Sequence, residues 1–205
     1  MKALDFSSFA RTLDLGTIPW LDFEVGQVSG KLTNSPQSKE KYSVYDLVFC
    51  PGNSFGHMTG GFDQGVVDVF GDEVEVKVRA MIEEKYFGMM PVGASEVVMH
   101  EGRGFVYTPT MMVPTKFTDI VIPYMCMYSS LLAAHRYEVS NDHQFARVLC
   151  PLFGVGTGSS DPHMALHQQL SALGAFIRGA MNKHSNMCTD LFKDGTARYL
   201  RLLRP

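Results

Sequence analysis

Two apolar segments of this chain each run directly into a glycine-rich loop that precedes the start of a helix, and this arrangement limits the available folds. The first segment, residues 42–50, ends in LVFC and continues into PGNSFGHMTGG. The second, residues 145–153, continues into GVGTGSS. Uninterrupted apolar runs are typical of strands covered on both faces. Loops with so many glycines indicate either close approach of the backbone to a ligand or a loose connection.

The rest of the chain alternates between strand and helix patterns. Strands are predicted at residues 20–28, 42–50, 93–99, 105–108 and 145–153, and a polar surface loop at 30–41. Helices are predicted at residues 63–70, 72–88, 119–137 and 161–183, with Asp72 and Asp161 as N-caps. This order predicts an α/β fold, a three-layer α/β/α sandwich with a mixed, largely parallel central sheet. We expect one domain over residues 1–205, with an extension of unassigned structure at 185–205.

Composition narrows the class of protein. The chain has 205 residues, 45% of them hydrophobic, and a net charge of -3, with no long basic block, so nucleic acid is not favoured as a partner. Its four cysteines are far apart and form no CxxC pair, which fits a reducing, cytoplasmic compartment and gives no zinc site. No apolar run is long enough to span a bilayer, so no membrane partner is expected. No cofactor or metal is predicted.

The two loops suit phosphate. Ligands of α/β sheets bind beyond the carboxyl ends of the strands, and glycine backbone next to a helix N-terminus offers free N–H groups. Two such loops suggest a ligand with more than one phosphate, or a phosphate flanked by sugars. Neither loop has the P-loop pattern GxxxxGK[ST], and neither has the dinucleotide fingerprint GxGxxG with its distant acid.

Three blocks of the sequence resemble the macro domain family, whose members bind ADP-ribose. CPGN at 50–53 falls on the family's Asn-Ala-Ala-Asn, and TGGFD at 59–63 falls on its glycine triplet and the two residues that follow. GASEVVMHEG at 93–102 and LCPLFGVGTG at 149–158 match two later blocks in the same order. The resemblance covers residues 42–178, and the form NSFGxMxGGxD looks like a divergent branch found in bacteria and their phages.

The resemblance implies a role for each matched residue. Asn53 would bind the distal ribose and Asp63 would orient or activate water, which makes these two the catalytic candidates. Gln27 would stand where the family carries an adenine-contacting acid. The remaining predicted ligand-binding residues offer backbone N–H groups to the phosphates and the distal sugar, and are Gly60, Gly61, Phe62, Gly154, Val155, Gly156, Thr157 and Gly158.

Three functions stay open at this point. The first is hydrolysis of ADP-ribose 1''-phosphate or of an ADP-ribosyl ester. The second is a non-catalytic module that binds or sequesters ADP-ribose-type signals, and the third is a virion or assembly component that retains the fold. Asp63 favours the first; the second is favoured by the altered Asn-Ala-Ala-Asn block and by Ser159-Ser160-Asp161, where the family often carries a ribose-stacking aromatic.

Simpler interpretations accompany these roles. Asn53 and its glycines fit a tight strand-to-helix connection, and Asp63 fits an N-cap of the helix at 63–70. His57 is expected in solvent. His163 and His167 share a helix face, but an exposed pair is favoured over a metal site because no third ligand is evident. Cys50 and Cys150 end apolar strands, where packing is favoured over nucleophilic chemistry.

Overall fold

The computed structural model describes residues 44–116 and 121–181 of the chain. Its elements in chain order are β1 (Leu47–Asn53), α3 (Gly61–Phe70), α4 (Glu73–Tyr86), β2 (Glu96–His100), β3 (Arg103–Met111), α5 (Ile122–Asn141), β4 (Val148–Leu149) and α6 (Pro162–Met181). The strand predicted at 20–28, the loop at 30–41, the basic segment at 185–205 and the candidate ligand residue Gln27 lie outside the described residues.

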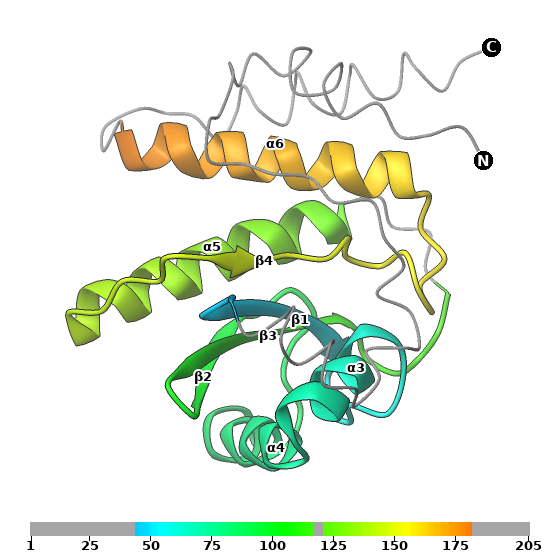
Figure 1. The fold of residues 1–205 in the computed structure, drawn as a ribbon. Helices are drawn as coiled ribbons and strands as arrows, with labels where there is room; N and C mark the ends of the chain where they lie inside the picture. The colour runs from blue at the N-terminus through cyan, green and yellow to red at the C-terminus, as the bar shows by residue number, and fades with distance from the viewer. Residues whose placement is uncertain (1–43, 117–120, 182–205) are drawn as a thin grey trace.

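The four described strands form one mixed sheet in the order β2-β3-β1-β4. β1 runs parallel to both β3 and β4, and β2 runs antiparallel to β3. Helices α3 and α4 lie on one side of this sheet, and α5 and α6 lie on the other (Figure 1). The predicted three-layer α/β/α sandwich with a mixed, largely parallel sheet is therefore confirmed.

Side chains of β1 alternate between the two faces of the sheet, as the period of two in a strand requires. Val48 and Cys50 belong to the core under α3 and α4, and Leu47 and Phe49 belong to the core under α5 and α6. All four are at most 1% exposed. Full burial of one such apolar side chain contributes about 1.5–3 kcal/mol, so the two cores hold β1 in the middle of the sandwich.

Both strands that lead into the glycine loops differ in length from the prediction. β1 begins at Leu47 and extends three residues past Cys50, because Pro51, Gly52 and Asn53 still lie opposite β3. β4 has only two residues in place of the nine predicted. The N–H groups just before it, those of Ala146 and Arg147, donate to the Asp46 carboxylate at 2.7 Å each, while the Arg147 carbonyl oxygen accepts the backbone N–H groups of Asp46 and Leu47.

The helix ends follow the predicted pattern only in part. Asp161 caps α6 as predicted, since its Oδ1 accepts the N–H of Met164 at 2.9 Å. Asp72 occupies the N-cap position of α4, as predicted, but its backbone is already helical and its side chain makes no capping hydrogen bond. Helix α4 ends at Tyr86, and its C-cap residue Phe87 takes the left-handed conformation (φ 52°) one residue before Gly88. Pro123 lies in the first turn of α5, as predicted.

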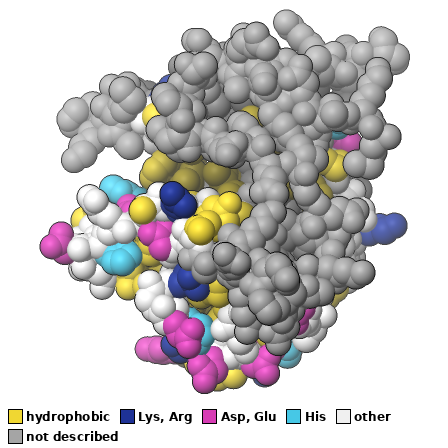
Figure 2. All heavy atoms as spheres, viewed as in Figure 1, with side chains coloured by type: hydrophobic (Ala, Val, Ile, Leu, Met, Phe, Trp, Pro, Cys, Tyr) yellow, Lys and Arg dark blue, Asp and Glu magenta, His cyan; other side chains and the backbone are white. Residues whose placement is uncertain are grey.

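Charged side chains gather over α4, at the bottom of the view in Figure 2. The exposed charged residues of this helix are mixed in sign and comprise Glu73, Lys77, Arg79, Glu83, Glu84 and Lys85. Lys85 Nζ lies 2.7 Å from Glu96 Oε2 on β2, an ion pair across the outside of the sandwich. None of the described helices is long and apolar enough to cross a membrane.

Candidate functional site

The sheet order brings the two predicted loops to one edge of the sandwich. β1 and β4 are parallel neighbours, with Leu47 opposite Val148 and Val48 opposite Leu149. The carboxyl ends of parallel strands meet at the same edge. The loop from Asn53 to Gly60 and the loop from Cys150 to Asp161 therefore leave the sheet side by side, and each runs to the N-terminus of a helix, α3 and α6 respectively.

The side chain of Asn53 is used within its own loop. Its Nδ2 donates to the carbonyl oxygen of His57 at 2.6 Å, and its Oδ1 accepts the N–H of Phe55 at 3.0 Å. The residue is only 7% exposed. An amide has two N–H donors and two acceptor lone pairs, so one of each remains for another partner. Asn53 thus shapes the loop, which supports the simpler interpretation of this residue, and retains limited capacity for a ligand.

Gly60, Gly61 and Phe62 form the start of α3. Gly60 is the extended N-cap and has no side chain to occupy the first N–H groups of the helix. Gly61 has a φ of +68°, and a Cβ built at either glycine would meet none of the residues that the structure describes within 4 Å. Both glycines are exposed, whereas Phe62 is half-buried and packs on the core under α3 and α4. Free N–H groups at a helix N-terminus favour an anion.

Asp63 lies in the first turn of α3 and is only 6% exposed. Its Oδ1 accepts the N–H of Gln64 at 2.9 Å. Burial raises the pKa of Asp63 from 3.8 to about 7, against the lowering effect of the backbone N–H groups of Gln64 and Gly60 and with a small further rise from Glu75. The predicted N-cap role is wrong in position, because the helix begins at Gly61 and its N-cap is Gly60.

Asp63→Asn is expected to change the pH dependence of stability. Between pH 3.8 and about 7 the folded state holds a proton on Asp63 that the unfolded state has released. Folded-state stability therefore falls as pH rises through this window, by roughly 3–4 kcal/mol in total. Asn cannot ionise and keeps one acceptor oxygen, so the free energy of unfolding of the variant should increase relative to that of the wild type as pH rises. Denaturant unfolding of both proteins at about pH 5 and about pH 8 measures this; a constant difference would contradict it.

The second loop closes on itself. The N–H of Ser160 donates to the carbonyl oxygen of Gly154 at 3.0 Å, and that of Ser159 to Gly156 at 2.9 Å. Gly154 has a φ of +78°. Of the predicted ligand residues in this loop, Gly154 and Gly158 are buried, Val155 is half-buried, and Gly156 and Thr157 are exposed. We therefore place the accessible part of the loop at its middle.

Gln169 on α6 anchors the beginning of this second loop, a contact that the sequence did not reveal. Its Oε1 accepts the N–H of the buried Phe153 at 2.7 Å, and its Nε2 donates to the carbonyl oxygen of Pro151 at 3.0 Å. Gln169 is itself 5% exposed. A glutamine in a helical stripe carries no sequence signal for such a role, because its partners are backbone groups of a distant loop.

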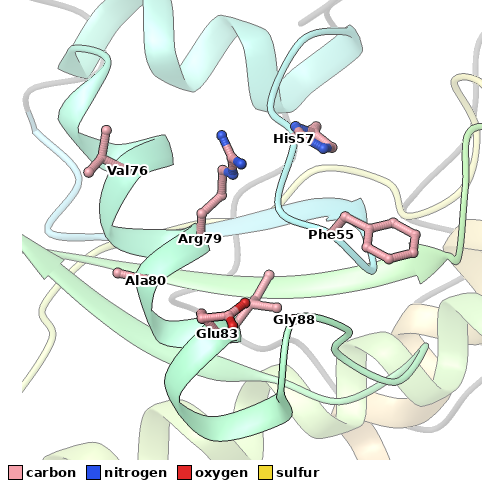
Figure 3. A pocket seen from close by; sticks show the side chains of 8 residues that line it. Phe55, His57, Val76, Arg79, Ala80, Glu83 and Gly88 are labelled. Carbon is pink, nitrogen blue, oxygen red and sulfur yellow. The ribbon is translucent and has the colours of Figure 1, made fainter.

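A hollow of about 440 Å³ lies between the first loop and α4. Phe55 and His57 line it from the loop, and Arg79 and Glu83 line it from α4, with Gly88 beyond the helix end (Figure 3). His57 is exposed, as predicted, and its Nδ1 lies 4.0 Å from Glu75 Oε1. None of the predicted glycines of either loop lines this hollow.

The predicted cysteine and histidine roles have different outcomes. Cys50 is fully buried, as predicted, and burial together with the Asp63 charge raises the pKa of its thiol well above the ordinary value. Cys150 is exposed as a residue, but its thiol is packed, as predicted: Sγ lies 3.7 Å from Met127 Sδ and 3.5 Å from Gln169 Nε2, and burial raises the pKa of the thiol to about 12. His163 is exposed and His167 half-buried. Within residues 44–116 and 121–181, no three His, Cys, Asp or Glu side chains are grouped to hold a metal ion.

Comparison with known proteins identifies the fold. No protein-family model matches the chain, and no curated protein sequence matches it significantly. The macrodomain of Mycobacterium tuberculosis DarG matches with a TM-score of 0.51 and 17% identity over 72% of this chain and 88% of that one. The Oceanobacillus iheyensis macrodomain with ADP matches with a TM-score of 0.53 and 15% identity over 87% and 90% of the two chains.

A mutant of the Oceanobacillus iheyensis macrodomain with ADPR also matches, with a TM-score of 0.52 and 14% identity over 86% of this chain and 91% of that one. At such low identity these matches establish the fold alone. The chain is therefore an α/β protein with a macrodomain fold.

Proposed function

We propose that this chain binds ADP-ribose or an ADP-ribose derivative at the edge of the sheet where β1 and β4 end. The observation that carries the proposal is the open N-terminus of α3 at Gly60 and Gly61, next to the second glycine loop. The backbone N–H groups of Gly61 and Phe62 suit a diphosphate, whereas the Asp63 carboxyl interacts with the N–H groups of Gln64 and Gly60. Similarity of the fold to macrodomains with ADP or ADPR in their solved structures supports the same ligand class.

In this proposal Gly60, Gly61 and Phe62 present N–H groups to one side of the diphosphate. The second loop, through Val155, Gly156 and Thr157, covers the other side. Asn53 offers its remaining N–H and lone pair to a ribose hydroxyl. Gln27, outside the described residues, is proposed for the adenine.

ADP-ribose is expected to bind at least tenfold more tightly than AMP, a difference of about 1.4 kcal/mol. AMP lacks the second phosphate and the distal sugar, and so leaves part of both loops without a partner. Isothermal titration calorimetry with the two ligands under the same conditions measures the ratio. Equal affinities, or no binding of ADP-ribose, would contradict the proposed function.

Hydrolysis is the second candidate, and Asp63 is the observation that favours it. A carboxyl group with a pKa near 7 is matched to general acid–base chemistry at neutral pH. Its burial and its bond to the Gln64 N–H favour instead a structural role in a reader without turnover. Assays for phosphate release from ADP-ribose 1''-phosphate and for cleavage of an ADP-ribosyl ester, with Asp63→Asn as the matched variant, decide between the two.

A further inference from the structure

Tyr107 lies in the middle of β3 and is completely buried. Its hydroxyl is bonded to both backbone polar groups of Asn53: it accepts the Asn53 N–H at 3.0 Å and donates to the Asn53 carbonyl oxygen at 2.8 Å. A phenolic hydroxyl has one donor and can accept as well, so a single oxygen can satisfy both groups. At Asn53 the Tyr107 side chain therefore pairs with the backbone N–H and carbonyl groups, which elsewhere along β1 pair with a neighbouring strand.

The ladder between β1 and β3 is irregular at this point, which explains why a side chain is needed. The register shifts between Gly52 and Asn53: Gly52 lies opposite Pro109, but Asn53 lies opposite Met111. Pro109 has no N–H to donate. Buried backbone groups left without partners are costly, since each loses its bonds to water. The Tyr107 hydroxyl supplies the donor and the acceptor at the point where the strand becomes the loop.

Gly52 leaves the room that this contact requires. A Cβ at Gly52 would overlap the hydroxyl and the adjoining ring carbons of Tyr107. The hydroxyl can reach Asn53 only because the residue before it has no side chain. Gly52 and Tyr107 therefore act as a pair, although they are far apart in the sequence.

The contacts continue from Asn53 into the loop. Its side chain holds the N–H of Phe55 and the carbonyl oxygen of His57, and its carbonyl oxygen also accepts the N–H of Gly56 at 3.3 Å. The loop then reaches Gly60 and the open start of α3. A shift of the Asn53 backbone would be passed on to these loop contacts.

We propose that Tyr107 is a positioning residue that holds Asn53 and the loop from Asn53 to Gly60 in the ligand-binding geometry. The inference rests on the proposed function for its ligand. Tyr107 touches no ligand itself in this scheme, because it is buried beneath the loop. It acts through the backbone of Asn53, by two hydrogen bonds that Phe at the same position cannot make.

The test is Tyr107→Phe, with Tyr86→Phe as the matched control. Tyr86 on α4 also bonds through its hydroxyl, but its partner is Glu96 Oε1 on β2 at 3.0 Å and not the backbone of Asn53. Amide hydrogen exchange and ADP-ribose titration are measured on the full chain, both below the variant's own midpoint of thermal unfolding. In Tyr107→Phe the Asn53 amide should exchange at least tenfold faster relative to the Phe105 and Val106 amides, and ADP-ribose affinity should fall at least tenfold (a loss of about 1.4 kcal/mol).

Tyr86→Phe should leave the relative Asn53 exchange and the affinity within about twofold of the wild type. A uniform rise in exchange along β1 and β3 would mark Tyr107 as a general core residue and overturn the inference. So would unchanged ADP-ribose affinity in Tyr107→Phe when the wild type binds. Failure of the wild type to bind ADP-ribose overturns the proposed function and the ligand part of this inference, and exchange at Asn53 then decides the positioning role alone.

Discussion

Gly61→Val is expected to lower the affinity for ADP-ribose more than tenfold while the protein remains folded. The φ of +68° at Gly61 is a conformation that a β-branched residue rarely adopts, and the strain costs about 1–3 kcal/mol. A Cβ there meets no atom of the described residues within 4 Å, so among them the added side chain occupies open space at the start of α3. In the proposed function that space belongs to the diphosphate. Calorimetry with ADP-ribose, beside thermal unfolding, measures both effects.

The matched control is Gly102→Val. Gly102 has a φ of +74°, and a Cβ there likewise meets none of the described residues within 4 Å, but it lies in the turn between β2 and β3, just before β3 begins. This turn is at the end of the sheet opposite the two loops, because β3 is parallel to β1. The Gly102→Val variant should lose about as much stability as Gly61→Val and should keep its affinity for ADP-ribose. If Gly61→Val binds like the control, the first loop is only a connection and the proposed site is wrong.

Gly52→Ala is expected to lower the free energy of unfolding by about 3 kcal/mol, at the upper end of what overpacking costs. The new methyl group overlaps the hydroxyl and ring of Tyr107, a fully buried side chain. Movement of Tyr107 would also break its two bonds to Asn53. The strand and the ring cannot both keep their positions, and the surrounding core leaves little room for either to shift. Denaturant-induced unfolding measures the change.

Gly179→Ala is the control for Gly52→Ala, and its expected change in stability has the opposite sign. Gly179 lies in α6, and a Cβ there meets no described residue within 4 Å. Alanine in a helix interior is favoured over glycine by about 1 kcal/mol, so this variant should be as stable as the wild type or more stable. If both glycine variants lost similar stability, the overlap with Tyr107 would not be the cause.

The sequence alone determined the layers of the fold and the position of the two loops. The apolar run at 42–50 predicts a strand covered on both faces, which β1 is, and the helical stripes predict the covering helices. The run at 145–153 indicated the place of a strand but not its form, because only Val148 and Leu149 pair and Val148 is exposed. These are local signals, because each depends only on the spacing of apolar residues along the chain. Gly60 and Gly61 likewise indicate, from the sequence alone, a stretch of backbone without side chains. The structure places these two glycines at the start of α3.

Only the tertiary structure decided how the loops are held. Tyr107 and Asn53 are 54 residues apart, and Gln169 lies 16 residues from Phe153. No spacing rule links such pairs, since they meet only after the sheet and α6 have packed. The burial of Asp63, which raises its pKa to about 7, also depends on the tertiary structure. From the sequence, an acidic residue at the start of a helix fits an N-cap equally well, because the core beneath the helix is not yet known. The sequence determined which backbone is free of side chains, and the packing determined which side chains hold that backbone in place.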